Sequence, residues 1–212
     1  MATALAAPID HLVWGSPDLE SAVDLLYERS GVRAAFGGSH PELGTRNAIA
    51  SLGERVFLEV LAPDPALAPG GVVRRLAKLD EPTLLMWAAR TRDAAGTAAR
   101  AKDAGYGVTM FEGRRTRPDG ELVRWTNVFV SGHGAGTLVP FFIEWDGVGH
   151  PAAESPSGLV LKSFSIETPD PASLRKVLAT LDVEATVRKG PRDLLRATID
   201  TSRGKLVLDG PA

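Results

Sequence analysis

The sequence has no cysteine among its 212 residues. This excludes disulfide bonds, thiolate catalysis and cysteine-ligated metal sites, and it fits a reducing compartment. The net charge is only −2, which gives no reason to expect binding to nucleic acid or to an anionic membrane. No apolar run approaches the roughly 20 residues needed to cross a bilayer, and Met1–Pro8 lacks the basic lead of a signal peptide. We therefore expect a cytoplasmic protein.

The chain has three segments that begin alike, at residues 9–18, 84–93 and 162–170. Each reads as a short apolar strand followed by Ser or Thr and then Asp, which is typical of a helix start. Apolar residues then recur at helical spacing, for example Leu19, Ala22, Val23 and Leu26 in the first segment. Helices are therefore expected near residues 19–30, 94–104 and 174–181.

Three strand-like runs follow each expected helix. They cover 33–36, 47–52 and 55–62, then 108–112, 123–130 and 138–145, and finally 185–187, 194–200 and 205–209. The order strand, helix, three strands thus occurs three times, which decides the fold class. We predict an α+β protein of repeated β-α-β-β-β modules, covering residues 8–64, 80–146 and 158–210. The modules should form a curled, cleft-enclosing mixed sheet with the helices outside.

Short motifs within this repeat suggest a family. The first unit opens with Ile9-Asp10-His11 and closes with Phe57-Leu58-Glu59, and it contains Gly44-Thr45-Arg46-Asn47. The second unit closes with Pro140-Phe141-Phe142-Ile143-Glu144-Trp145. These segments resemble the vicinal oxygen chelate superfamily, which holds glyoxalase I, extradiol dioxygenases and bleomycin-resistance proteins, and within it a glyoxalase-like branch.

The resemblance implies a metal site in a cleft formed by two modules. The first strand of each module would offer an imidazole and the last strand a carboxylate, which assigns His11, Glu59 and Glu144 as ligands. Met86 stands where a second histidine would be expected. One imidazole with two carboxylates suits Mn, Fe(II), Ni or Zn. Such an ion could chelate two adjacent substrate oxygens and stabilise an enolate.

Other residues are candidates for catalysis or substrate contact. A displaced Glu144 could shuttle a proton, and His40, in a glycine-rich loop, could act as acid or base or supply the second imidazole. The predicted substrate-binding residues are His40, Asn47, Arg124, Trp125 and Phe142. Arg124 could pair with a substrate carboxylate, while Trp125 and Phe142 could form an aromatic wall.

Plainer interpretations exist for the same residues. Glu59 and Glu144 could be paired with arginines at strand ends, and His11 could be a buried, hydrogen-bonded histidine. His40 could be an exposed turn residue, and aromatic residues in such strands usually belong to the core.

Two functions therefore remain open. The first is a metal-dependent lyase, isomerase or dioxygenase that acts on a small molecule with vicinal oxygens. The alternative is a metal-free protein of the same fold that binds and sequesters a small molecule. The partner is a small molecule in both cases, and unpaired module edges favour a homodimer.

Overall fold

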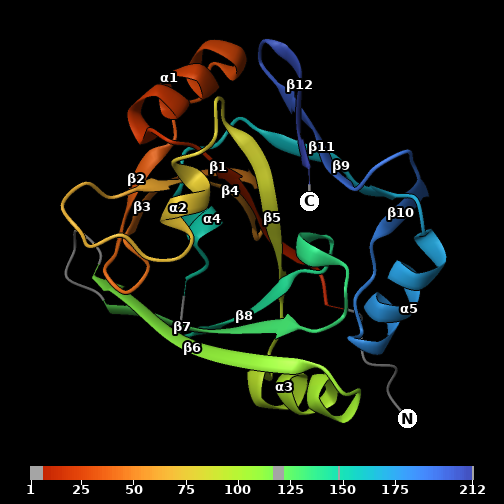
Figure 1. The fold of residues 1–212 in the computed structure, drawn as a ribbon. Coiled ribbons are helices and arrows are strands. Elements are labelled where there is room, and N and C mark those ends of the chain that lie inside the picture. The colour runs from red at the N-terminus through yellow and green to blue at the C-terminus, as the bar shows by residue number, and fades with distance from the viewer. Residues whose placement is uncertain (1–6, 117–121, 148, 212) are drawn as a thin grey trace.

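The computed structural model describes residues 7–116, 122–147 and 149–211, and three β-α-β-β-β units follow one another along this chain (Figure 1). The first unit contains β1 (Ile9–Gly15), α1 (Leu19–Ser30), β2 (Ala35–His40), β3 (Thr45–Gly53) and β4 (Val56–Pro63). The second contains β5 (Thr83–Arg90), α3 (Ala94–Asp103), β6 (Gly107–Thr116), β7 (Leu122–Ser131) and β8 (Phe141–Asp146). The third contains β9 (Val160–Thr168), α5 (Pro171–Thr180), β10 (Thr186–Lys189), β11 (Leu194–Thr201) and β12 (Gly204–Pro211). The connections hold the short helices α2 (Val73–Leu76), η1 (Gly136–Leu138) and α4 (Pro151–Glu154).

The three longer helices begin at the predicted aspartates. Asp18, Asp93 and Asp170 each accept a hydrogen bond from the backbone N–H three residues later. Such a cap satisfies one of the N–H groups that the first turn of a helix leaves without a partner. The repeated Ser/Thr-x-Asp or Thr-Pro-Asp signal therefore fixes where each helix leaves its preceding strand.

The first two units share one eight-stranded mixed sheet in the order β2-β3-β4-β1-β5-β8-β7-β6. β1 and β5 pair antiparallel at its middle, and each pairs in parallel with the last strand of its own unit, β4 or β8. The predicted fold class, with paired modules in a curled mixed sheet, is confirmed. The cleft described below lies within this sheet.

The third unit forms a separate four-stranded sheet in the order β10-β9-β11-β12. One of its faces joins the main hydrophobic core, where Phe164 packs on Trp87 with ring centroids 5.0 Å apart. Its other face is polar, and there Arg196 lies between Glu167 and Asp209. The third unit thus covers one side of the core of the first two units and does not extend their sheet. The expected homodimer stays a prediction.

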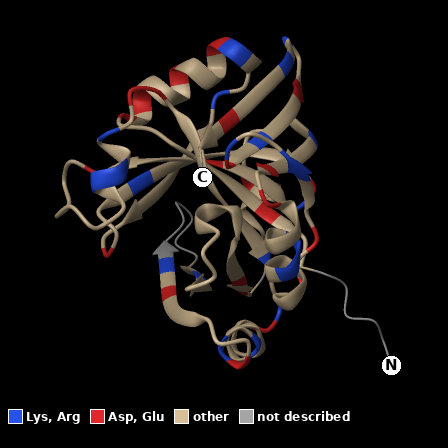
Figure 2. Cartoon of the chain, turned by 45° about the vertical axis from the view of Figure 1, so that its right-hand side comes forward, with Lys and Arg blue, Asp and Glu red and all other residues tan. Residues whose placement is uncertain are grey.

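Charged residues of both signs are distributed over the helices, turns and strands (Figure 2). This distribution agrees with the small net charge. None of the helices in the described ranges is long and apolar enough to cross a membrane.

Candidate functional site

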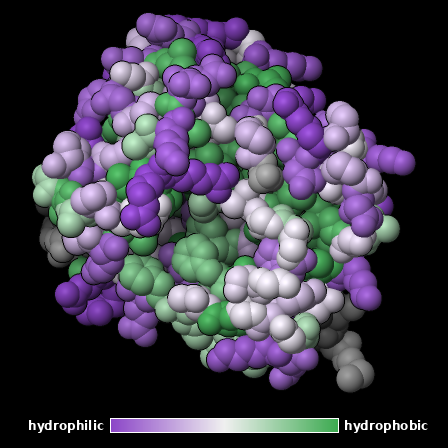
Figure 3. Space-filling view, viewed as in Figure 1, coloured by the Kyte–Doolittle hydropathy of each residue, from purple (hydrophilic) through white to green (hydrophobic). Residues whose placement is uncertain are grey.

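The large sheet encloses a cleft of about 260 Å³ that both of its units line. This volume is slightly below the ~300–1,000 Å³ of pockets that hold drug-sized ligands. Apolar side chains dominate the walls, and Figure 3 shows a hollow in one face of the molecule with apolar side chains in it and hydrophilic residues around it. The aromatic residues of the wall are Phe57, Phe111, Trp125, Phe129, Phe141 and Trp145. A ligand smaller than a typical drug and largely apolar would fit.

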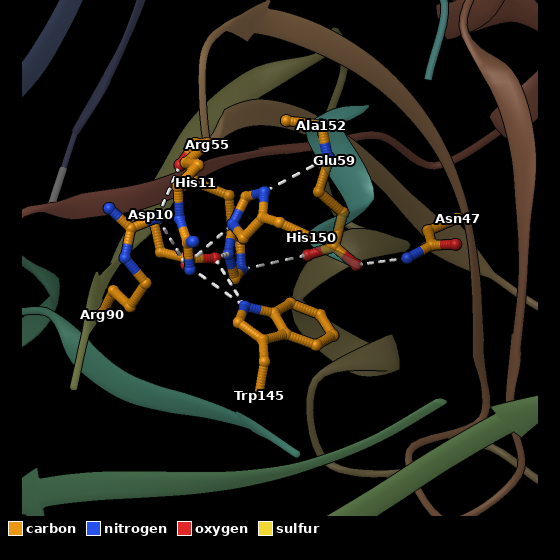
Figure 4. A network of polar contacts seen from close by, with 9 residues as sticks. All are labelled: Asp10, His11, Asn47, Arg55, Glu59, Arg90, Trp145, His150 and Ala152. Carbon is orange, nitrogen blue, oxygen red and sulfur yellow. Dashed lines mark hydrogen bonds and ion pairs between the residues drawn. The ribbon is translucent and has the colours of Figure 1, made fainter. Parts of the chain in front are cut away.

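The polar centre of the site is built on Asp10, whose side chain is fully buried behind the residues that line the cleft. Its carboxylate receives Nδ1 of His11 at 2.8 Å, Nε2 of His150 at 3.0 Å and the indole nitrogen of Trp145 at 3.1 Å (Figure 4). The guanidinium of Arg90 lies 3.7 Å away. A register shift in the β1–β5 pairing between Ile9 and His11 marks an irregularity of the kind that can bring adjacent strand side chains together.

The charge on Asp10 determines which ring nitrogen of His11 carries a proton. Burial alone would raise the pKa of the Asp10 carboxyl, but hydrogen bonds from His11 and His150, and their charges, together hold it well below its usual range. An ionised carboxylate only accepts hydrogen bonds, so Nδ1 of His11 carries a proton and donates it. In the neutral imidazole, Nε2 then has a free lone pair. That atom faces Glu59 of the cleft wall, 3.8 Å from Oε2.

Glu59 is the second polar group of the centre. Its other oxygen accepts a hydrogen bond from the side-chain amide of Asn47 at 2.5 Å. The same amide nitrogen lies 3.5 Å from Nε2 of His40, whose Nδ1 is 3.0 Å from the hydroxyl of Thr45. The imidazole of His11 stacks on Phe57 with centroids 4.5 Å apart. The ionisable side chains of His11, His40 and Glu59 are thus held by hydrogen bonds and ring contacts beside an apolar wall.

The structure brings together five of the predicted site residues. His11, His40, Asn47, Glu59 and Trp125 all line the cleft. Their roles in catalysis or ligand contact remain predictions.

Three other predicted residues lie outside the cleft. In β8 the side chains of Phe141, Ile143 and Trp145 face it, so Phe142 and Glu144 point to the opposite face. Phe142 is 1 % exposed and belongs to the main core. Glu144 accepts a hydrogen bond from the backbone N–H of Ala94 at 2.8 Å and so caps the start of α3. The predicted ligand and proton-shuttle roles of Glu144 and the predicted substrate contact of Phe142 do not agree with this geometry.

Arg124 also lies away from the cleft. In β7 the side chains of Trp125 and Asn127 line the cleft, whereas Arg124 lines an adjoining cavity together with Glu144. Arg124 is thus not part of the cleft lining, and its pairing with a substrate carboxylate stays a prediction.

The strand register explains why the Glu144 carboxylate points away from the cleft. Within the first unit Val13 pairs with Glu59, and across the two units Val13 pairs with Met86 and His11 with Ala88. The alike segments 9–18 and 84–93 place Met86 at the position of His11 and Ala88 at that of Val13. In the second unit Ala88 pairs with Phe141, so Phe141, three residues before Glu144, is the counterpart of Glu59. A shift of the register by an odd number of residues places a side chain on the opposite face of the sheet.

A divalent ion does not fit the residues that the cleft offers. Of the four related positions, two hold His11 and Glu59, while the other two hold the apolar side chains of Met86 and Phe141. In the ranges that the structure describes, no group of three or more His, Cys, Asp or Glu side chains is placed to hold a metal ion. The donor set is thus incomplete for the metal that the family resemblance implies.

Comparison with known proteins agrees with this fold. The sequence profile of the glyoxalase-like domain family matches residues 9–181. The chain belongs to this family. No curated protein matches the sequence.

Several solved structures share the architecture of this glyoxalase-like protein. A hypothetical protein from Staphylococcus aureus has a TM-score of 0.65 at 11% identity, over 96% of this chain and 85% of that one. A mutant of 4-hydroxymandelate synthase from Streptomyces coelicolor has a TM-score of 0.53 at 15% identity, over 98% and 64%. Methylmalonyl-CoA epimerase from Mycobacterium tuberculosis has a TM-score of 0.50 at 21% identity, over 72% and 96%. At these identities the likeness shows the vicinal oxygen chelate fold alone.

Three residues of the polar centre were not predicted from the sequence: Asp10, Trp145 and His150. An acid beside a histidine in an otherwise apolar strand was the available signal for Asp10. His150 follows the last strand of the second unit in a turn, is 7 % exposed, and accepts at Nδ1 the backbone N–H of Ala152 at the start of α4. The order His-Pro at a helix start was its only local signal.

Proposed function

We propose that this glyoxalase-like protein is a metal-independent isomerase or lyase that moves a proton on a small, largely apolar molecule. The observation that carries the proposal is the pair Asp10–His11. Asp10 holds the Nδ1 proton of His11 and leaves Nε2 directed into the cleft. An imidazole held by a carboxylate in this way is suited to general acid–base work.

The chemistry needs no ion. Nε2 of His11 removes a proton from a carbon next to a carbonyl group, and a proton returns from the imidazolium to another position of that molecule, so an isomerisation balances without a further reactant. In D₂O the imidazolium proton can exchange with solvent before it returns. Asp10 stabilises the imidazolium that forms meanwhile, because its negative charge is buried beside the ring. Glu59, held by Asn47, is a second group that can accept or return a proton. Oxygenation by a redox metal has no matching ligand set in this cleft.

The aromatic residues that line the cleft indicate the class of substrate. Trp125, Phe129 and Phe141 offer aromatic faces, and Phe129 stacks on Phe141 with centroids 5.1 Å apart. We expect a compound with an aromatic or branched apolar part and one carbonyl-type group near His11.

A test combines binding with proton exchange. Protein treated with a chelator is screened by NMR against small aryl ketones and aldehydes in D₂O, and the carbon-bound protons of each binder are followed. We expect enzyme-dependent loss of one proton signal, unaffected by chelator. His11→Gln should abolish it with binding within about threefold, whereas His133→Gln, a histidine outside the cleft, should change neither. Exchange that appears only after metal is added would contradict the proposal.

The metal-free binding protein is the second candidate. The observation that favours it is the apolar wall, in which Met86 and Phe141 occupy the two positions related to His11 and Glu59. Tight binding of several apolar compounds without proton exchange on any of them would indicate a protein that sequesters small molecules.

A further inference from the structure

A second cavity lies beyond Asp10, on the side away from the cleft. It has a volume of about 630 Å³, and four arginines line it. Arg55 comes from the β3–β4 turn, Arg90 from the end of β5, Arg92 from the loop that follows, and Arg100 from α3. Figure 4 shows Arg55 and Arg90 on one side of Asp10 and the cleft residues Glu59 and Asn47 on the other.

The positive charge in this cavity is poorly balanced. Asp182 is the one acidic residue among its described lining residues. Arg55, Arg92 and Arg100 form no ion pair with another residue of the described ranges, and Arg90 has only the contact of 3.7 Å with Asp10. The segment Met1–Ala6, which precedes the lining residue Ala7, contains no acidic side chain.

We propose that this cavity is a binding site for a phosphate group. Guanidinium groups present forks of N–H donors that match phosphate oxygens two at a time, and several of them suit a dianion better than a single carboxylate. The lining also contains Thr91 and Thr97, whose hydroxyls are 3.0 Å apart and can turn toward a ligand. The volume admits more than a phosphate ion, so the group can also belong to a small phosphomonoester.

The state of Arg90 supports this assignment. Partial burial and the positive charges of Arg55 and Arg92 lower its pKa, and the carboxylate of Asp10 opposes them. A bound dianion would relieve the repulsion between Arg90 and its neighbours Arg55 and Arg92, because it brings negative charge into the cavity that they line.

The site is connected to the cleft through the same arginine. Arg90 donates a hydrogen bond to the backbone oxygen of Arg55 at 2.8 Å and approaches Asp10, which holds His11. A phosphate that recruits Arg90 removes positive charge from beside Asp10 and so changes the electrostatic environment of His11. Any resulting effect on turnover rests on the proposed function, whereas phosphate binding itself does not.

Calorimetric titration of the whole protein with inorganic phosphate tests the site. We expect one saturable site per chain and a loss of affinity of roughly tenfold or more in Arg92→Gln/Arg100→Gln, since hydrogen bonds to charged groups are the strong ones. The matched control is Arg74→Gln/Arg75→Gln, which removes the same charge from two exposed arginines of α2 and should bind as the wild type does. Circular dichroism verifies that both variants are folded.

Absence of saturable binding, or equal losses in the two double variants, would overturn the proposal, because the second result means a general charge effect. Tighter binding of glycerol phosphate than of inorganic phosphate would identify a phosphomonoester as the source, and equal binding would identify the free ion. The NMR signals of the Arg90 side chain should shift on titration. His11→Gln should bind phosphate normally, so failure of the proposed catalysis is distinguishable from failure of this site.

Discussion

Replacement of Asp10 by asparagine probes the centre of the site with almost no change of shape. Asp10 is fully buried, and its two oxygens receive the ring nitrogens of His11 and His150 and the indole N–H of Trp145. In Asp10→Asn one carboxylate oxygen becomes an NH₂ group, so at least one of these N–H donors faces another donor instead of an acceptor. Arg90 also loses its nearest negative charge.

The size of the effect follows from these contacts. A hydrogen bond to a charged group contributes about 1.5–3 kcal/mol, and at least one of the three bonds cannot form in the variant. Removing one partner of a buried charged cluster typically costs about 3–5 kcal/mol. We expect Asp10→Asn to lower the free energy of unfolding at neutral pH by ~3–5 kcal/mol.

The pH dependence has a definite sign. The folded pKa of Asp10 lies well below the ~3.9 of an unfolded aspartate. Below about pH 4 the unfolded chain therefore binds a proton that the folded chain does not, and stability falls as the pH falls. The difference between wild type and Asp10→Asn should be full above pH 4 and should shrink below it.

Urea denaturation of both proteins between pH 3 and 7 measures these differences. Asp200→Asn is the control, because its carboxylate is only partly buried and its ion pair with Lys162, at 3.5 Å, is open to solvent, so the change in stability should be less than ~1 kcal/mol. A loss below ~1 kcal/mol in Asp10→Asn would refute the account of a charged, fully hydrogen-bonded Asp10.

Three further substitutions test the walls of the cleft and the loop beside it. Trp125→Ala should weaken binding of an aromatic ligand about tenfold in calorimetry and leave urea stability within ~1 kcal/mol, since Trp125 is only partly buried. Asn127→Leu should raise the unfolding free energy by ~1 kcal/mol, because its buried carbonyl oxygen has no described partner; a lower value would show that the oxygen is satisfied. Gly44→Ala should cost ~1–3 kcal/mol, because Gly44 has φ 69° and a Cβ would collide with the backbone oxygen of Ala68, whereas Gly71→Ala, with open space around it, should be near neutral.

The fold could be predicted from the sequence because its signals are short-range. The aspartates at 18, 93 and 170 mark helix starts through short-range hydrogen bonds, and the repeated order of elements follows from apolar spacing. The resemblance to the vicinal oxygen chelate superfamily assigned His11 and Glu59 to one site, and Asn47 belongs to a motif that carries the same resemblance.

The parts that were missed depend on register and long-range contact. The runs ending in Glu59 and Glu144 look alike, but their pairing with β1 and β5 differs by three residues, and a sequence contains no direct record of that offset. Trp145 and His150 meet Asp10 from about 140 residues away along the chain. No local pattern predicts such a meeting.

The protonation of the His11 ring is the most direct test of the account. In chelator-treated protein at alkaline pH, long-range proton–nitrogen NMR distinguishes the two neutral tautomers. We expect a proton on Nδ1, no proton on Nε2, and no change of these signals when Zn²⁺ is added. A proton on Nε2, or a stoichiometric shift of the His11 signals with Zn²⁺, would contradict a metal-free base held by Asp10.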